Sequence, residues 1–217
     1  MSITYPIDLL SDFPGWATLT LDHGDELSGQ AGGQVRVKNV RAPLWRMKAE
    51  TNRLKPSAFR QWKARMESLE NGGKTFLGYD MSACYPILYP NGSWPTGGSF
   101  LGTTAAIHTV SSTRSIRVKQ LPAGYVVSVG DFIAVNDGTS PAGSYGLHMA
   151  VETATADGSG ITPEFEIRPP LRQWTEADHP VSVKRPSCLM MLVPGSLSTP
   201  VGLDGRGTVS FEALQVV

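Results

Sequence analysis

The chain has 217 residues, of which 41% are hydrophobic, so it is long enough to bury one large core or two smaller ones. Nineteen basic residues balance nineteen acidic residues, which excludes the basic footprint of a sequence-specific nucleic-acid-binding protein. Only 18% of the residues are charged, and such a neutral surface favours self-association because little repulsion keeps copies apart. The 23 glycines and 16 prolines are typical of short strands joined by turns, so we expect a mainly β protein.

The N-terminal segment lacks the basic and apolar regions of a secretory signal, so we expect synthesis and folding in the cytosol. The longest apolar run, CLMMLV at residues 188–193, is too short to span a bilayer, which predicts no membrane insertion. Cys84 and Cys188 match no metal-binding spacing and lie far apart in the sequence. Both are therefore predicted to be buried free thiols.

Two neighbouring segments near the N-terminus differ in pattern. Residues 23–33 contain turn formers and almost no apolar side chains, which predicts a mobile loop. Residues 34–50 alternate apolar and polar side chains, which predicts two half-buried strands separated at Pro43. The apolar residues of these strands are Val35, Val37, Trp45, Met47 and Ala49.

One segment, residues 56–73, has the pattern of an amphipathic helix. Its apolar residues recur every three or four positions and form one stripe, which we expect to pack against a sheet. Pro56 suits the first helical turn and Gly72 suits the left-handed C-terminal position, whereas Lys55 is a poor N-cap. The stripe consists of Phe59, Trp62, Met66 and Leu69.

A strand is expected at residues 75–79, after an Asn-Gly turn, and a proline- and glycine-rich passage follows at residues 85–102. This change of composition predicts a connector between two domains, in which Trp94 and Phe100 dock onto a protein surface. From Ala105 onward, short β runs recur with glycine-rich turns between them, which predicts a barrel or sandwich of five or six strands. The runs are residues 115–121, 126–138, 144–157, 163–172 and 181–187.

The last thirty residues resemble the first eighty in style, with two predicted strands at residues 188–193 and 207–216. The final strand is expected to pair with an N-terminal strand. We therefore predict an insertion, in which one domain is built from residues 1–90 and 188–217 and a small barrel of residues 91–187 lies between its two parts.

No sequence pattern of a catalytic, cofactor-binding or metal site emerges, so no such residues are predicted, and we expect a protein that is not an enzyme and has no cofactor. The four histidines occur singly, and His148 suits a sheet position with its hydrogen bonds satisfied. The sequences NDG at residues 136–138 and DGSG at residues 157–160 lack the ligands of a calcium loop and predict turns. Solvated surface positions are expected for the acidic and basic neighbours Asp22, Asp25, Glu26, Asp178 and His179.

The order of several short patterns resembles the distal tail protein of long-tailed, siphovirus-like bacteriophages. A strand is followed by a helix with an aromatic residue, then by a leucine before a glycine turn and a phenylalanine strand. A Gly-Asp strand and a Pro-Pro-Leu-Arg sequence follow in the middle of the chain. The segments concerned are LWRMKAE at 44–50, FRQW at 59–62, LENGGKTFL at 69–77, VGDFIAV at 129–135 and GITPEFEIRPPLR at 160–172.

This resemblance implies a structural virion protein of the tail tip, or baseplate. In such a family a homohexameric ring joins the tail tube to the hub, its first domain is a β-sandwich belt with one flanking α-helix, and its second is an oligonucleotide/oligosaccharide-binding-type (OB) barrel that faces outward. Expected partners are other copies of the chain, the tail tube, hub and tape-measure proteins, and receptor-binding proteins.

Two alternatives remain open from the sequence. One is another tail component, such as a tube subunit or a partner of the hub. The other is a carbohydrate-binding barrel that recognises host surface glycans through aromatic side chains. The aromatic candidates for such a site are Trp94, Tyr145 and Trp174.

Overall fold

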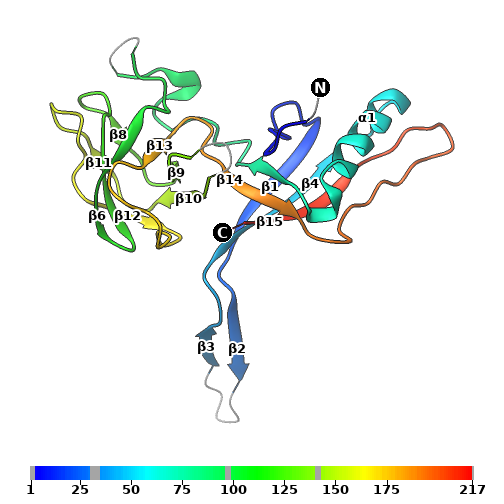
Figure 1. Cartoon of the computed structure of the whole chain (residues 1–217), viewed down its shortest axis with the longest axis horizontal. Coiled ribbons are helices and arrows are strands. Elements are labelled where there is room, and N and C mark those ends of the chain that lie inside the picture. Colours follow the sequence, from blue (N-terminus) through cyan, green and yellow to red (C-terminus); the bar gives the residue numbers. More distant parts are fainter. Residues whose placement is uncertain (1–2, 30–34, 96–98, 140–142, 217) are drawn as a thin grey trace.

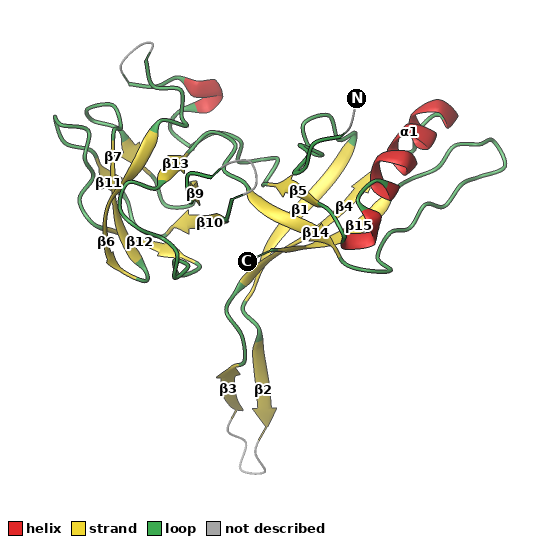
Figure 2. Ribbon diagram, viewed as in Figure 1, coloured by secondary structure: helices red, strands yellow, loops and turns green. Residues whose placement is uncertain are grey.

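A computed structural model describes residues 3–29, 35–95, 99–139 and 143–216. These residues form a five-stranded sheet, a closed six-stranded barrel beside it and a two-stranded arm that projects from the sheet (Figure 1). The prediction of a mainly β protein with a small barrel is therefore confirmed. One α-helix, α1 (Pro56–Glu67), occurs in the part of the chain that the structure describes, and two short 3-10 turns, Glu70–Gly72 and Pro90–Gly92, accompany it (Figure 2).

The five-stranded sheet combines strands from both ends of the chain. Its spatial order is β1 (Gly15–Asp22), β4 (Leu44–Thr51), β15 (Ser210–Gln215), β14 (Cys188–Leu192) and β5 (Thr75–Gly78), and every neighbouring pair is antiparallel. The final strand thus pairs with a strand from the N-terminal part, as expected. Because the barrel strands lie between β5 and β14 in the sequence, the chain enters the barrel after β5 and returns to the sheet at β14.

The alternation in β4 places Trp45, Met47 and Ala49 on the buried face of the sheet, as predicted. The helix α1 covers the same face and buries the predicted stripe, with Leu69 following just after the helix. Lys55 provides no side-chain cap. The sandwich is not confirmed, because the helix, the N-terminal segment and the barrel cover this face where a second sheet was expected.

The expectation of a mobile loop at residues 23–33 is wrong for the part that the structure describes. Strand β2 (Asp25–Gly29) pairs with β3 (Val35–Asn39) in a regular antiparallel register and forms the arm, while residues 30–33 lie outside the described residues. Val37 is not half-buried as predicted, since 60% of its surface is exposed. No other strand of the described chain pairs with the arm, which leaves both outer edges of its hairpin without a neighbouring strand.

The barrel closes through six strands, in agreement with the predicted number. Their order around the barrel is β10 (Tyr145–Ala150), β12 (Phe165–Arg168), β7 (Ser115–Lys119), β6 (Ala105–Ser112), β13 (Pro180–Ser182) and β9 (Phe132–Asn136). Two predicted runs are each interrupted, because short β8 (Val126–Val127) and β11 (Ala154–Thr155) pair with each other outside the barrel. Strand β6 was not among the predicted runs.

The connector docks onto the barrel through aromatic rings, as predicted. Trp94 contacts Tyr89, Phe100 and Tyr125, with ring centroids 5.0–6.3 Å apart. The buried carboxylate of Asp131 fastens the same segment, since it accepts hydrogen bonds from the backbone N–H groups of Ile87 and Ser128, each at 2.8 Å. Burial raises the pKa of Asp131, although these two hydrogen bonds act in the opposite direction.

The sheet and the barrel share a packed junction. The indole Nε1 of Trp45 donates a hydrogen bond of 2.7 Å to the carbonyl oxygen of Leu147 in β10, and its ring lies 5.5 Å from that of Phe132. Arg172 of the barrel donates a hydrogen bond of 3.0 Å to the carbonyl oxygen of Pro43 beside β4. Leu147 and Ala134 belong to the same apolar core as the sheet. The barrel therefore covers one end of the sheet as α1 covers the other.

Candidate functional site

The histidines are dispersed over the molecule. His23 lies at the base of the arm, His108 contacts Thr109 in β6, and His179 lies beside the ring of Trp174 on the barrel. Over the described ranges, no group of three or more histidine, cysteine or acidic side chains is arranged to hold a metal ion.

His148 lies in β10 as expected, but its environment differs from the prediction. Its Nδ1 is 2.8 Å from the carbonyl oxygen of Pro169, whereas its buried Nε2 has no partner among the described residues. The pKa of His148 is lowered to about 4, chiefly by burial and to a smaller extent by Arg172, while the contact with the carbonyl oxygen of Pro169 acts in the opposite direction. The ring is therefore neutral at physiological pH and serves the junction as a packed side chain.

Acidic residues named from the sequence make surface contacts. Asp22 pairs with Arg41 at 2.6 Å, Asp25 accepts a hydrogen bond from Asn39, and Asp178 pairs with Lys119. The backbone N–H of Gly24 is the main cause of a lowered pKa at Asp22. These contacts give each carboxylate a structural role in the arm or the barrel.

The two predicted turns are confirmed. Asp137 accepts hydrogen bonds from Thr139 and from the backbone of Ser144, which hold its pKa at about 2. Asp157 similarly accepts hydrogen bonds from the backbone N–H groups of Ser159 and Ile161.

Both cysteines are free thiols, as predicted, but only one of them is fully buried. Cys188 lies in the core of the sheet, and burial raises the pKa of its thiol to about 12. Cys84 is half-buried in the connector, where its thiol contacts the carbonyl oxygen of Met81. Burial also raises the pKa of Cys84, so neither thiol is activated as a nucleophile.

The arm continues the β1–β4 pair beyond the body of the molecule. The last pair of the sheet on this side is Asp22 with Leu44, and the arm register begins at Asp25 with Asn39. The ion pair of Asp22 with Arg41 and a backbone hydrogen bond from Val40 to Gly24 join the two parts. Figures 1 and 2 show the arm extending well away from the sheet and the barrel.

One edge of the sheet is covered and the other is free. At the β5 edge, the backbone N–H of Leu77 donates to the carbonyl oxygen of Ile7, so the N-terminal segment occupies that edge. At the opposite edge, β1 has only β4 beside it among the described strands, over eight residues. Trp16 of β1 is 50% exposed. An unpaired edge of this length is a template for a strand of another chain.

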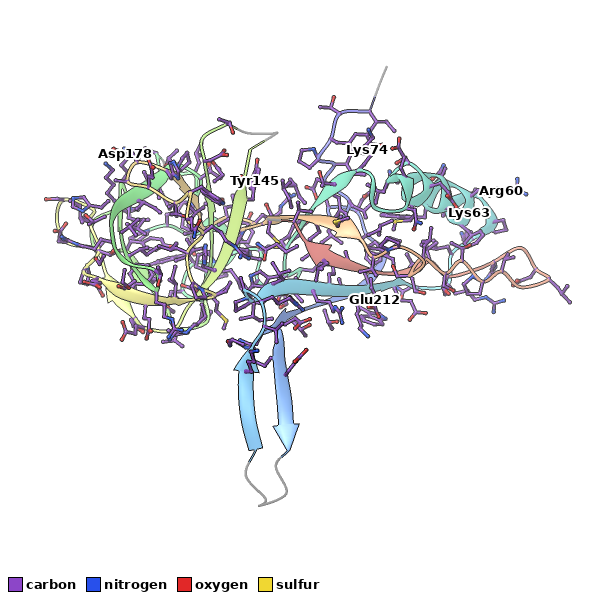
Figure 3. The ribbon with its side chains drawn as sticks, turned by 60° about the horizontal axis from the view of Figure 1, so that its bottom comes forward. Arg60, Lys63, Lys74, Tyr145, Asp178 and Glu212 are labelled. Atoms are coloured by element: carbon purple, nitrogen blue, oxygen red, sulfur yellow. The ribbon has the colours of Figure 1, made fainter. Side chains whose placement is uncertain are left out.

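The open face of the sheet is polar and carries both signs of charge. Lys48 of β4 pairs with Glu212 of β15 at 2.9 Å, and Figure 3 shows Glu212 on the side of the sheet away from α1. Arg60 and Lys63 point outward from α1 in the same view.

The three aromatic candidates for sugar binding have different environments. The ring of Trp94 is surrounded by the rings of the connector and the barrel. Trp174 packs against the barrel core and lies 5.8 Å from the ring of His179. Tyr145 lies at the start of β10, toward the sheet (Figure 3). The three rings do not line a common cavity among those of the described chain.

Comparison with known proteins adds no assignment to these features. No protein-family model and no curated protein sequence matches the chain. None of the helices in the described part of the chain has the length and hydropathy that a bilayer-spanning helix needs.

Proposed function

We propose that the protein is a structural subunit of a bacteriophage tail tip, which assembles with other copies of itself into a closed ring. The observation that carries this proposal is the solvent-exposed arm of β2 and β3 beside the free edge of β1. Exposed strands of this kind are usually blunted or covered in monomeric proteins, and here another copy would provide the cover.

The arm and the β1 edge are different surfaces, so a contact between them is heterologous. Repeated heterologous contacts close into a ring when the rotation per subunit divides a full turn. The resemblance to distal tail proteins favours a hexamer, with the sheet and α1 as the belt and an OB-type barrel facing outward. The balance of nineteen basic and nineteen acidic residues fits a ring through which DNA passes, because a strongly basic lumen would trap it.

In the virion, this ring would join the tail tube to the hub and the adsorption apparatus. Its partners would be the tail tube, hub and tape-measure proteins, with receptor-binding proteins attached to the barrel. A tube subunit or hub partner would use the same arm and edge, and differs only in its position along the tail. A glycan-binding barrel is less well supported, because the ring of Trp94 is enclosed by neighbouring aromatic rings.

The mass in solution tests the proposal. A hexamer has six times the 23.3 kDa of the chain, about 140 kDa, which light scattering after size exclusion measures directly. Negative-stain images of the same peak should show six-fold rings. A monomer, at concentrations up to those of an assembling tail and in the presence of tube protein, would contradict the proposal.

Removal of the arm tests its assignment. Deletion of residues 24–33 removes β2 and should shift the peak from the ring toward the monomer. The matched control is Arg60→Gln on the outer side of α1, which should leave the mass unchanged. An unaltered ring after the deletion would assign ring closure to another surface.

A further inference from the structure

A cavity of about 580 Å³ lies where the base of the arm meets the barrel. Its walls come from the end of β1 with residues 39–43, from the turn between β6 and β7, and from the chain at and after the end of β12. Each of the three parts contributes one arginine: Arg41, Arg114 and Arg168. None of the described residues that line this cavity is acidic.

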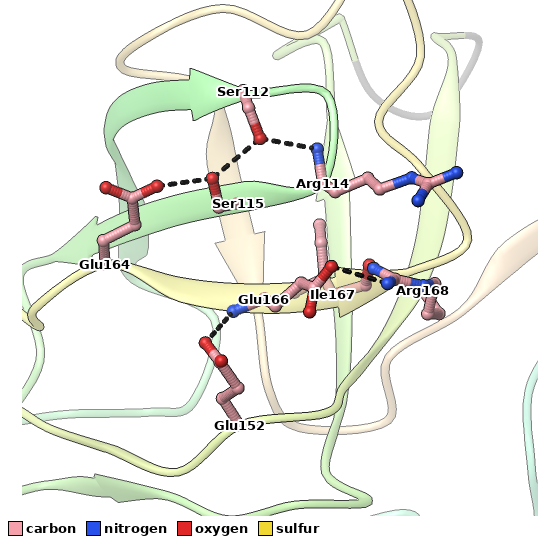
Figure 4. Close-up of polar contacts among 8 residues, drawn as sticks. All are labelled: Ser112, Arg114, Ser115, Glu152, Glu164, Glu166, Ile167 and Arg168. Atoms are coloured by element: carbon pink, nitrogen blue, oxygen red, sulfur yellow. Dashed lines mark hydrogen bonds and ion pairs between the residues drawn. The ribbon is translucent and has the colours of Figure 1, made fainter.

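The turn that carries Arg114 is held by a chain of hydrogen bonds, which Figure 4 shows. The backbone N–H of Arg114 donates to the hydroxyl oxygen of Ser112, which is 2.8 Å from the hydroxyl of Ser115. Ser115 in turn donates to a carboxylate oxygen of Glu164 at 2.5 Å. The carbonyl oxygen of Arg114 accepts the backbone N–H of Ile167. The backbone of Arg114 is therefore fixed before any ligand arrives.

The guanidinium of Arg114, by contrast, has no hydrogen-bond or ion-pair partner among the described residues. A guanidinium offers five N–H donors in a planar fork that matches the two oxygens of a carboxylate or phosphate. Because the backbone is already positioned, a bound oxyanion would have to order only the side chain, and this lowers the entropic cost of binding.

The other two arginines are each restrained by one carboxylate. Arg41 pairs with Asp22 at 2.6 Å, and Arg168 pairs with Glu166 at 2.5 Å and donates to the carbonyl oxygen of Ile167. Each ion pair involves one nitrogen of the guanidinium group, so Arg41 and Arg168 keep other N–H groups that can donate to a ligand. The three guanidinium groups therefore have only two carboxylate partners, and the net charge around the cavity is positive.

We propose that this cavity is an anion-binding site whose ligand carries a carboxylate or phosphate group. Arg114 binds this group, together with the remaining N–H donors of Arg41 and Arg168. The proposal is independent of ring formation. Its ligand has two chemical sources: a small phosphate-type anion, or the acidic side chains of a peptide. The apolar part of the wall, which includes Pro43, Pro169 and Pro170, provides contact for the carbon atoms of either ligand.

Two titrations of the full chain separate these sources. Inorganic phosphate and a hexaglutamate peptide are added in turn to the protein in low salt, and binding is followed by isothermal titration calorimetry. We expect at least one of them to bind, with an affinity that falls as sodium chloride is raised. Phosphate binding alone identifies a small-anion site, and peptide binding identifies a site for acidic side chains.

The variant Arg114→Gln should weaken this binding at least about tenfold, since a charge-assisted hydrogen bond is lost. Arg114→Lys keeps the charge without the fork and should show an intermediate affinity. The matched control is Arg60→Gln, which removes an exposed arginine from α1 and should bind as the wild type does. Thermal unfolding of each variant reports whether the fold is retained.

Either of two results overturns the proposal: no binding of phosphate or peptide, or equal binding by Arg114→Gln and Arg60→Gln. The mass of the particle is measured on the same samples. A ring that forms without anion binding contradicts only the anion site, whereas anion binding by a protein that stays monomeric in the presence of tube protein contradicts only the ring.

Discussion

At the scale of single residues, His148 makes stability depend on pH. Its pKa is lowered to about 4 in the folded chain by burial, against an ordinary value of 6.5. Below pH 6.5 the unfolded chain takes up a proton that the folded chain does not, so the free energy of unfolding falls as the pH falls toward 4. Between pH 7 and 5 we expect this histidine alone to cost about 2 kcal/mol.

Urea unfolding at pH 7 and pH 5 measures this effect. In His148→Gln the fall in unfolding free energy between the two pH values should be smaller than in the wild type, because the other titrating groups contribute equally to both proteins. Parallel curves for wild type and His148→Gln would show that the ring of His148 titrates normally.

At the scale of elements, the attachment of α1 to the sheet rests on its buried stripe. Met66 is fully buried in the core that α1 shares with the sheet. Met66→Ala leaves a cavity and should lower the unfolding free energy by about 2–5 kcal/mol. Lys63→Ala, one turn earlier on the exposed side, should change it by less than about 0.5 kcal/mol. Equal effects of the two substitutions in denaturant unfolding would contradict the packing described.

Apart from β1, the elements with a clear apolar period are predictable from the sequence, and those without one are not. In strand β4 and in helix α1 the apolar residues recur with a single period, and the predictions of both elements are confirmed. The sequence of β2, DELSG, has no apolar period and predicts a loop, and only pairing with β3 makes it a strand. Strand β6 was missed because three consecutive buried residues and two register shifts obscure its alternation.

Strand β1 was also missed, although Ala17, Leu19 and Leu21 alternate with exposed residues on its other face. No periodic pattern or motif in the sequence predicts the anion-binding cavity. Arg41, Arg114 and Arg168 lie far apart in the sequence, and only the docking of the arm base against the barrel brings them to one cavity. The sandwich prediction was not confirmed, because the sequence does not reveal that the barrel itself packs on the sheet.

At the scale of the whole molecule, the barrel and the sheet differ in how far they depend on each other. Every buried member of the barrel core lies between Tyr89 and Val183, so this core is complete within one continuous stretch. The core of the sheet, in contrast, includes Ala134 and Leu147 from the barrel. Separation would therefore leave the barrel core intact and uncover part of the sheet.

Limited proteolysis tests this asymmetry and the predicted insertion together. Cleavage just before Tyr89 and within residues 186–188 should release a middle fragment that keeps a cooperative thermal transition, because this fragment retains every buried member of the barrel core. The remaining sheet fragments should lose theirs, because the cover over Trp45 and its hydrogen bond to Leu147 are gone. Weakening the same contact in the intact chain by Trp45→Phe should accelerate both cuts, since the carbonyl oxygen of Leu147 is left without its donor. First cleavage inside the barrel strands, or a middle fragment that unfolds without a transition, would show that the barrel is not an independent unit.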